Sequence, residues 1–153
     1  MNESETAYCV RLLKQMAALE VALADFYAAC ASRRFNEPLC TRISNEELGH
    51  ANCFKSMADT LKERKGVGFT EGQPISFENV AAFSAYIKEQ TRAVVEGKLP
   101  HGNAFAVAAG MERRFLDSRY AEIVKTEDPE CAAMMDTILK ETAAHVTLMS
   151  GGS

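Results

Sequence analysis

The sequence predicts an all-α fold in which four long helices form two hairpins joined by one long crossover. Glycine and proline are few, 9 and 4 among 153 residues, and they gather in short stretches that leave long segments free of helix breakers. Within those segments apolar residues recur three and four positions apart, which is helical spacing. No segment alternates apolar and polar residues or contains an Asn-Gly or Asp-Gly turn, so no strand is predicted. We expect a single domain spanning residues 1–153, long enough to bury a core.

The first hairpin is predicted from residues 5–65. A helix over about residues 5–34 presents one apolar face, formed by Leu13, Met16, Ala17, Ala24, Tyr27 and Ala31. Asn36 followed by Glu37 and Pro38 is typical of a helix N-cap with proline in the first turn. The second helix therefore starts there and is expected to run to about residue 65.

The second hairpin follows a crossover over residues 66–100, which holds a Gly- and Pro-containing loop and then a helix-compatible stretch at 77–97. A third main helix is expected over about residues 104–125, capped by residues 101–103. Asp128 and Pro129 repeat the cap-plus-proline start for a fourth, which ends near the C-terminal Ser-Gly-Gly-Ser. Short links within pairs and one long connection between them describe a four-helix bundle of ferritin-like topology.

Composition excludes several classes of protein. Hydrophobic residues make up 47% and charged residues 25%, which is too apolar for a disordered chain. The net charge of -4 provides no positive field for nucleic acid. The acidic start lacks the pattern of a secretory signal, and no stretch approaches the ~20 apolar residues of a membrane span. We therefore expect a cytoplasmic, soluble protein with neither nucleic acid nor membrane as a partner.

The cysteines do not predict a disulfide framework. They are five in number, which is odd, and none forms a C-x-x-C pair: Cys9, Cys30, Cys40, Cys53 and Cys131. A thiolate zinc site or a rubredoxin-type iron site is therefore not encoded, and we expect reduced thiols in or beside the core.

The residues with the clearest chemical signal lie in the second predicted helix. Glu47 and His50 stand in the middle of an apolar stripe with Ile43, Phe54 and Met57. Residues three apart share a helix face, so a carboxylate and an imidazole point side by side into the core. A buried carboxylate without a partner is costly, and a divalent metal removes that cost because it accepts carboxylate oxygen and imidazole nitrogen together.

Each of the other three main helices supplies similar groups. Glu20 and Glu112 interrupt the apolar faces of the first and third helices, and Glu141 and His145 lie about 40° apart on an inward face of the fourth. Taken singly, each has an ordinary alternative: a glutamate at a stripe's edge is solvated, and a core histidine is hydrogen-bonded. Together they match the ligand set of two-metal carboxylate bundles. The predicted metal ligands are Glu20, Glu47, His50, Glu112, Glu141 and His145.

Two tyrosines are candidate catalytic residues. Tyr27 and Tyr120 follow Glu20 and Glu112 by about two turns of helix. They could hydrogen-bond ligand carboxylates or donate protons, or they could simply pack as core aromatics. His101, before the third helix, is expected at the surface or in a cap.

Four segments carry a family resemblance. E-V-A-L-A-D-F-Y at residues 20–27, E-E-L-G-H at 46–50, Met111 with Glu112, and L-K-E-T-A-A-H at 139–145 resemble the four helices of rubrerythrin-like proteins of the ferritin-like superfamily. The resemblance implies a centre of two iron ions that reduces hydrogen peroxide, or reacts with dioxygen, in oxidative-stress defence, usually in a homodimer. In this hypothesis His50 and His145 are end ligands, and Glu47 bridges the ions, with Glu141 if it reaches. Manganese or zinc also suits these ligands.

The sequence departs from that family at three points. Thr142 stands three before His145, where the family has a glutamate, and Phe115 stands where rubrerythrins carry a second carboxylate. There is no rubredoxin domain, so the electrons would come from an external donor such as a rubredoxin. Two alternatives therefore remain: a metal-binding or iron-handling protein with a degraded site and no useful turnover, and a metal-free bundle that serves as a dimerisation or scaffold module.

Overall fold

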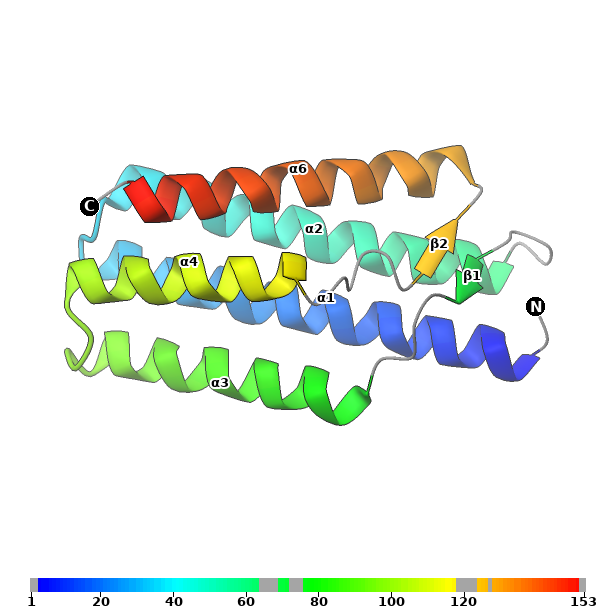
Figure 1. Cartoon of the computed structure of the whole chain (residues 1–153), viewed down its shortest axis with the longest axis horizontal. Helices are drawn as coiled ribbons and strands as arrows, with labels where there is room; N and C mark the ends of the chain where they lie inside the picture. The colour runs from blue at the N-terminus through cyan, green and yellow to red at the C-terminus, as the bar shows by residue number, and fades with distance from the viewer. Residues whose placement is uncertain (1–2, 64–68, 72–75, 118–123, 127, 152–153) are drawn as a thin grey trace.

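The computed structural model describes residues 3–63, 69–71, 76–117, 124–126 and 128–151, and it is built almost wholly of helices (Figure 1). The helices are α1 (Glu3–Ser32), α2 (Glu37–Glu63), α3 (Phe77–Val95), α4 (His101–Asp117) and α6 (Pro129–Gly151). Two short strands, β1 (Phe69–Glu71) and β2 (Val124–Thr126), pair antiparallel. The all-α prediction is confirmed, but the sequence pattern does not predict this small two-stranded sheet.

The helices run along the long axis of the molecule, and the two termini lie at opposite ends (Figure 1). α1 packs against α2 and α3, α4 packs against α6, and α6 packs against α2. The predicted crossover thus contains a full helix, α3, which covers α1 and returns the chain to the start of α4. Helices α1, α2, α4 and α6 are the four that the sequence predicts as the main helices.

Side-chain caps explain where α3 and α6 begin. The Asp128 side chain accepts a hydrogen bond from the Cys131 amide at 3.0 Å, which confirms the predicted cap of α6. Ser76 caps α3 by accepting from the Asn79 amide at 3.3 Å. Between α1 and α2 the chain turns through Arg34 and Asn36, whose φ angles of 62° and 51° are left-handed.

The predicted end of the third main helix is wrong. The sequence analysis extends it to about residue 125, whereas α4 ends at Asp117 and residues 124–126 form β2. Val124 and Thr126 are β-branched and favour extended backbone, and β1 supplies the backbone partners of β2. A three-residue strand is too short for an alternating pattern to reveal it in the sequence.

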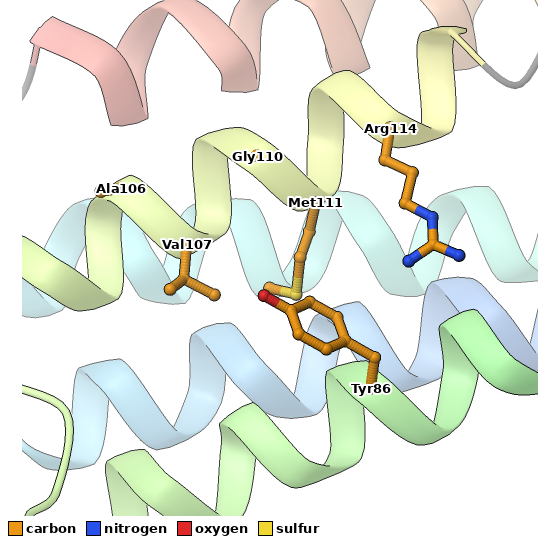
Figure 2. A pocket seen from close by; sticks show the side chains of 6 residues that line it. All are labelled: Tyr86, Ala106, Val107, Gly110, Met111 and Arg114. Carbon is orange, nitrogen blue, oxygen red and sulfur yellow. The ribbon is translucent and has the colours of Figure 1, made fainter.

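An open groove of about 440 Å³ separates α3 from α4 on the outside of the bundle. Figure 2 shows Tyr86 reaching from α3 toward Val107 and Met111 of α4, with Arg114 beside them. The described residues that line the groove include no carboxylate or imidazole, so they are separate from the buried acidic residues described below. None of the described helices combines the length and apolar character needed to cross a membrane.

Candidate metal centre

Five of the six predicted metal ligands lie fully buried in the middle of the bundle. Helix α1 contributes Glu20, α2 contributes Glu47 and His50, α4 contributes Glu112, and α6 contributes His145, each at most 1% exposed. All five sit on the apolar faces that the sequence pattern predicts, so the packing that buries those faces also brings the polar groups together. Within the described residues, the interior of the bundle therefore contains three carboxylates and two imidazoles.

The five residues form two groups that share one member. Ligand atoms of Glu20, Glu47 and His50 lie within 4.8 Å of one another, and so do ligand atoms of Glu47, Glu112 and His145. Glu47 belongs to both groups. Each group offers two carboxylates and one imidazole, a donor set that suits iron, manganese or zinc.

The same atom of each imidazole faces the carboxylates. His50 Nδ1 lies 3.1 Å from Glu20 Oε2 and 3.7 Å from Glu47 Oε1. His145 Nδ1 lies 2.8 Å from Glu47 Oε1 and 3.3 Å from Glu112 Oε2. The two rings lie 6.0 Å apart between centroids and are inclined by 25°. The two halves of the site therefore repeat one arrangement.

The other nitrogen of each imidazole contacts an outer carboxylate. His50 Nε2 lies 2.7 Å from Glu141 Oε1, and His145 Nε2 lies 2.8 Å from Glu46 Oε1. The side chains of these two glutamates are partly exposed, 38% for Glu141 and 29% for Glu46. Metal-binding histidines commonly give their second nitrogen to such a carboxylate, which orients the ring.

The structure thus places Glu141 beside His50 and outside both groups, although the sequence analysis treats it as a ligand. Glu46 is a site residue that the sequence analysis misses. It directly precedes Glu47, and one residue turns a helix by about 100°, so its carboxylate emerges at the edge of the buried face. The signal was the paired Glu-Glu of the E-E-L-G-H segment.

Two positions lack the carboxylates that a resemblance to rubrerythrin-like proteins would place there. Thr142 is buried, and its hydroxyl donates to the Ile138 carbonyl at 2.7 Å, so its own helix satisfies it. Phe115 is 1% exposed and packs in the core. Among the described residues, the buried carboxylates are therefore Glu20, Glu47 and Glu112.

Glu47 is the group least satisfied by the protein. It is 0% exposed, and neither of its carboxylate oxygens has a hydrogen-bond partner among the described residues. His145 Nδ1 lies 2.8 Å from Glu47 Oε1 but lacks hydrogen-bond geometry. The Glu20 carboxylate is also within reach, but two carboxylates attract each other only when they share a proton or a cation. Burial raises the pKa of Glu47 well above its usual range, and the charges of Glu112 and Glu20 raise it further.

The neighbouring groups show the same need for positive charge. Burial raises the pKa of Glu112 despite the opposing effect of His145. Burial alone would lower the pKa of His50 and of His145, but the carboxylates on both sides of each ring outweigh it and raise both. Without a metal the centre therefore retains protons, and a metal ion would displace them.

One of the two candidate tyrosines lies at the centre. The Tyr27 hydroxyl donates to Glu112 Oε1 at 3.4 Å, and its ring lies edge-on to His145 at 6.4 Å. Burial and then the charge of Glu112 raise the pKa of Tyr27 well above its usual value, so the phenol keeps its proton. Tyr120 lies outside the described residues.

His101 takes no part in the centre. It is the first residue of α4, and its ring stacks on Phe35 at 5.0 Å and meets Phe105 edge-on at 4.5 Å. The expected surface or capping role is thus replaced by partly buried aromatic packing at one end of the bundle.

Comparison of the chain with protein-family models, curated proteins and solved structures yields no match.

Proposed function

We propose that the protein is a rubrerythrin-like di-iron carboxylate oxidoreductase, built on a ferritin-like four-helix bundle, that reduces hydrogen peroxide or reacts with dioxygen. The observation that carries the proposal is Glu47, a fully buried carboxylate at the junction of two ligand groups. Neither of its oxygens has a hydrogen-bond partner in the part of the chain that the structure describes. Such a group is stable in a dry interior only when a proton or a cation neutralises it. Two metal ions sharing Glu47 would satisfy both oxygens.

The donor set fits two ions of the same kind. Glu20 and His50 would hold one ion, Glu112 and His145 would hold the other, and Glu47 would serve both. Two divalent ions together with three buried carboxylates leave about one positive charge. Thr142 stands at the position where a fourth carboxylate would cancel that charge. That excess favours a small anionic partner, and deprotonated hydrogen peroxide carries one negative charge.

Iron at this site would supply one electron per ion, which together meets the two-electron requirement of cleaving the peroxide O–O bond. The protein's own residues would orient ligands and handle protons. Glu46 and Glu141 accept from the Nε2 atoms, which directs the Nδ1 lone pairs of His145 and His50 inward. Because the side chains of Glu46 and Glu141 are partly exposed, they connect the two Nε2 atoms to solvent. Tyr27 holds a proton next to Glu112.

We also propose that electrons come from an external donor such as a rubredoxin, that the working unit is a homodimer and that the protein acts in the cytoplasm. A second candidate function is metal binding or iron handling without turnover. Thr142 favours this alternative, because the missing carboxylate weakens the hold on the second ion. The two functions differ in how many ions bind and in whether bound iron reacts.

The test is metal content after anaerobic Fe(II) loading and desalting, followed by absorbance on adding peroxide. We expect about two iron ions per chain, and we expect peroxide to oxidise them rapidly. Fewer ions, or iron inert to peroxide, would favour the second candidate. Glu47→Gln should abolish paired loading, whereas Ser44→Ala, a matched change of a buried polar residue on the same helix, should not. Two ions retained in Glu47→Gln would refute the ligand assignment.

A further inference from the structure

Two buried cysteines face each other where α1 turns into α2. Cys30 lies in the last turns of α1 and Cys40 in the first turn of α2, and both are 0% exposed. Their thiols lie within hydrogen-bonding reach of each other. The other three cysteines are distributed over α1, α2 and α6.

The turn between the helices fixes this pair. The Phe35 amide donates to the Cys30 carbonyl at 3.0 Å, and the Cys40 thiol donates to the Phe35 carbonyl at 3.0 Å. Phe35 is thus hydrogen-bonded to the Cys30 backbone and to the Cys40 thiol at once, which brings the two cysteines together at the turn. Residues 32–34 and 36–38 around the pair are exposed, so the pair lies just beneath the surface at that end of the bundle.

The two thiols are chemically unequal. The hydrogen bond from Cys30 lowers the pKa of the Cys40 thiol, against the effect of burial, and the same bond with burial raises that of Cys30 well above its usual value. A thiol that loses its proton more readily is the better nucleophile and electron donor.

Tyr27 connects the pair to the metal centre. It lies one turn before Cys30 on the same face of α1, where side chains three residues apart are neighbours. Its hydroxyl reaches Glu112, as described above. A buried tyrosine that contacts Glu112 therefore lies one turn from Cys30. Burial raises the pKa of Tyr27 most, and the charges of Glu112 and of the two cysteines raise it further.

We propose that Cys30 and Cys40 form an internal dithiol that delivers two electrons to peroxide reduction at the metal centre and is itself converted to a disulfide. The inference rests on the proposed function. In the net reaction one hydrogen peroxide and two thiols give two waters and one disulfide: two S–H bonds and the O–O bond break, and one S–S bond forms. Sulfur is oxidised by two electrons, the peroxide oxygens are reduced by two, and both thiol protons end in water. An external dithiol reductant restores the pair.

Counting peroxide equivalents tests the inference. The full chain is loaded with Fe(II) without oxygen, freed of reductant and titrated with hydrogen peroxide, and free thiols are then counted by alkylation and mass measurement. Paired Fe(II) and the dithiol each hold two electrons, so the wild type should consume about two equivalents and lose two thiols. Cys30→Ser and Cys40→Ser should each consume about one, half the wild-type amount. Cys53→Ser, the matched control on α2, should behave as the wild type.

The outcomes separate this inference from the proposed function. Consumption of about one equivalent by the wild type with all thiols free would overturn the internal donor and leave the proposed function standing. No consumption by any variant would overturn both. A disulfide formed equally fast in zinc-loaded protein, or one mapped to another cysteine, would overturn electron transfer through the metal centre. Cys30→Ala and Cys40→Ala repeat the test without a new buried hydroxyl, and thermal melting confirms their folding.

Discussion

Replacing Glu47 by glutamine should change the stability of the protein in opposite directions with and without metal. In the metal-free protein at pH 8 the native state must either bury the Glu47 carboxylate, which has no hydrogen-bond partner among the described residues, or hold a proton on it above its usual pKa; both cost stability. Glutamine keeps the shape and removes the charge. Relief of one uncompensated buried polar group is worth about 1–3 kcal/mol, and a chain of this length gains about 2–4 °C in Tm per kcal/mol. Metal-free Glu47→Gln should therefore melt roughly 2–12 °C above the wild type.

The metal-loaded protein should reverse this order. A ligand that binds only the native state adds about 2.7 kcal/mol at a concentration of 100 times its Kd. The wild type gains this stability and the variant, which lacks the shared carboxylate, loses most of it. Calorimetry of both proteins, with chelator and with excess Fe(II) or Zn(II), checks the crossing. A metal-free variant that melts below the wild type at pH 8 would show that Glu47 is satisfied without a cation, which refutes the reasoning.

Four further predictions concern the same centre. First, urea unfolding of the metal-free protein should show that the free energy of unfolding falls as pH rises above about 4.5. The pKa values of Glu47, Glu112 and both buried histidines are raised in the native state, so each group favours folding below its unfolded pKa and ceases to do so above its native pKa. A flat profile would contradict this prediction. Second, Thr142→Glu supplies the missing carboxylate and should tighten binding of the second ion at least about tenfold, measured by Fe(II) titration. Third, Glu141→Gln and Glu46→Gln should weaken metal binding about 10–100-fold at unchanged stoichiometry; loss of an ion would instead make either residue a ligand. Fourth, Tyr27→Phe should keep both ions but slow peroxide consumption about tenfold or more in stopped flow, and an unchanged rate would leave Tyr27 as a packing residue only.

The centre was largely predictable because its ligands interrupt apolar stripes. Glu47 and His50 are polar residues at positions where the helical period demands apolar ones, and a single sequence reveals such a conflict. Glu46 and Glu141 could not be placed the same way. Both stand at the border of a helix face, where the side-chain rotamer and the neighbouring helix decide which way the carboxylate points.

The end of α4 and the small sheet were unpredictable for a different reason. Residues 124–126 form a strand because β1, more than fifty residues earlier, lies beside them. Pairing of that kind is a tertiary effect that local propensity does not contain. The contact between Cys30 and Cys40 likewise depends on how the α1–α2 turn folds, which the spacing of two cysteines does not specify.

The two outer contacts of the imidazoles also determine how the hairpins align. His50 of α2 meets Glu141 of α6, and His145 of α6 meets Glu46 of α2, so the same two helices are tied twice in reciprocal fashion. Sliding α6 along α2 by one turn, about 5.4 Å, would break both ties and separate the shared carboxylate from one of its groups. The centre thus fixes the alignment of the two halves of the chain. Ions bound there would leave only when the hairpins separate, in a single cooperative event.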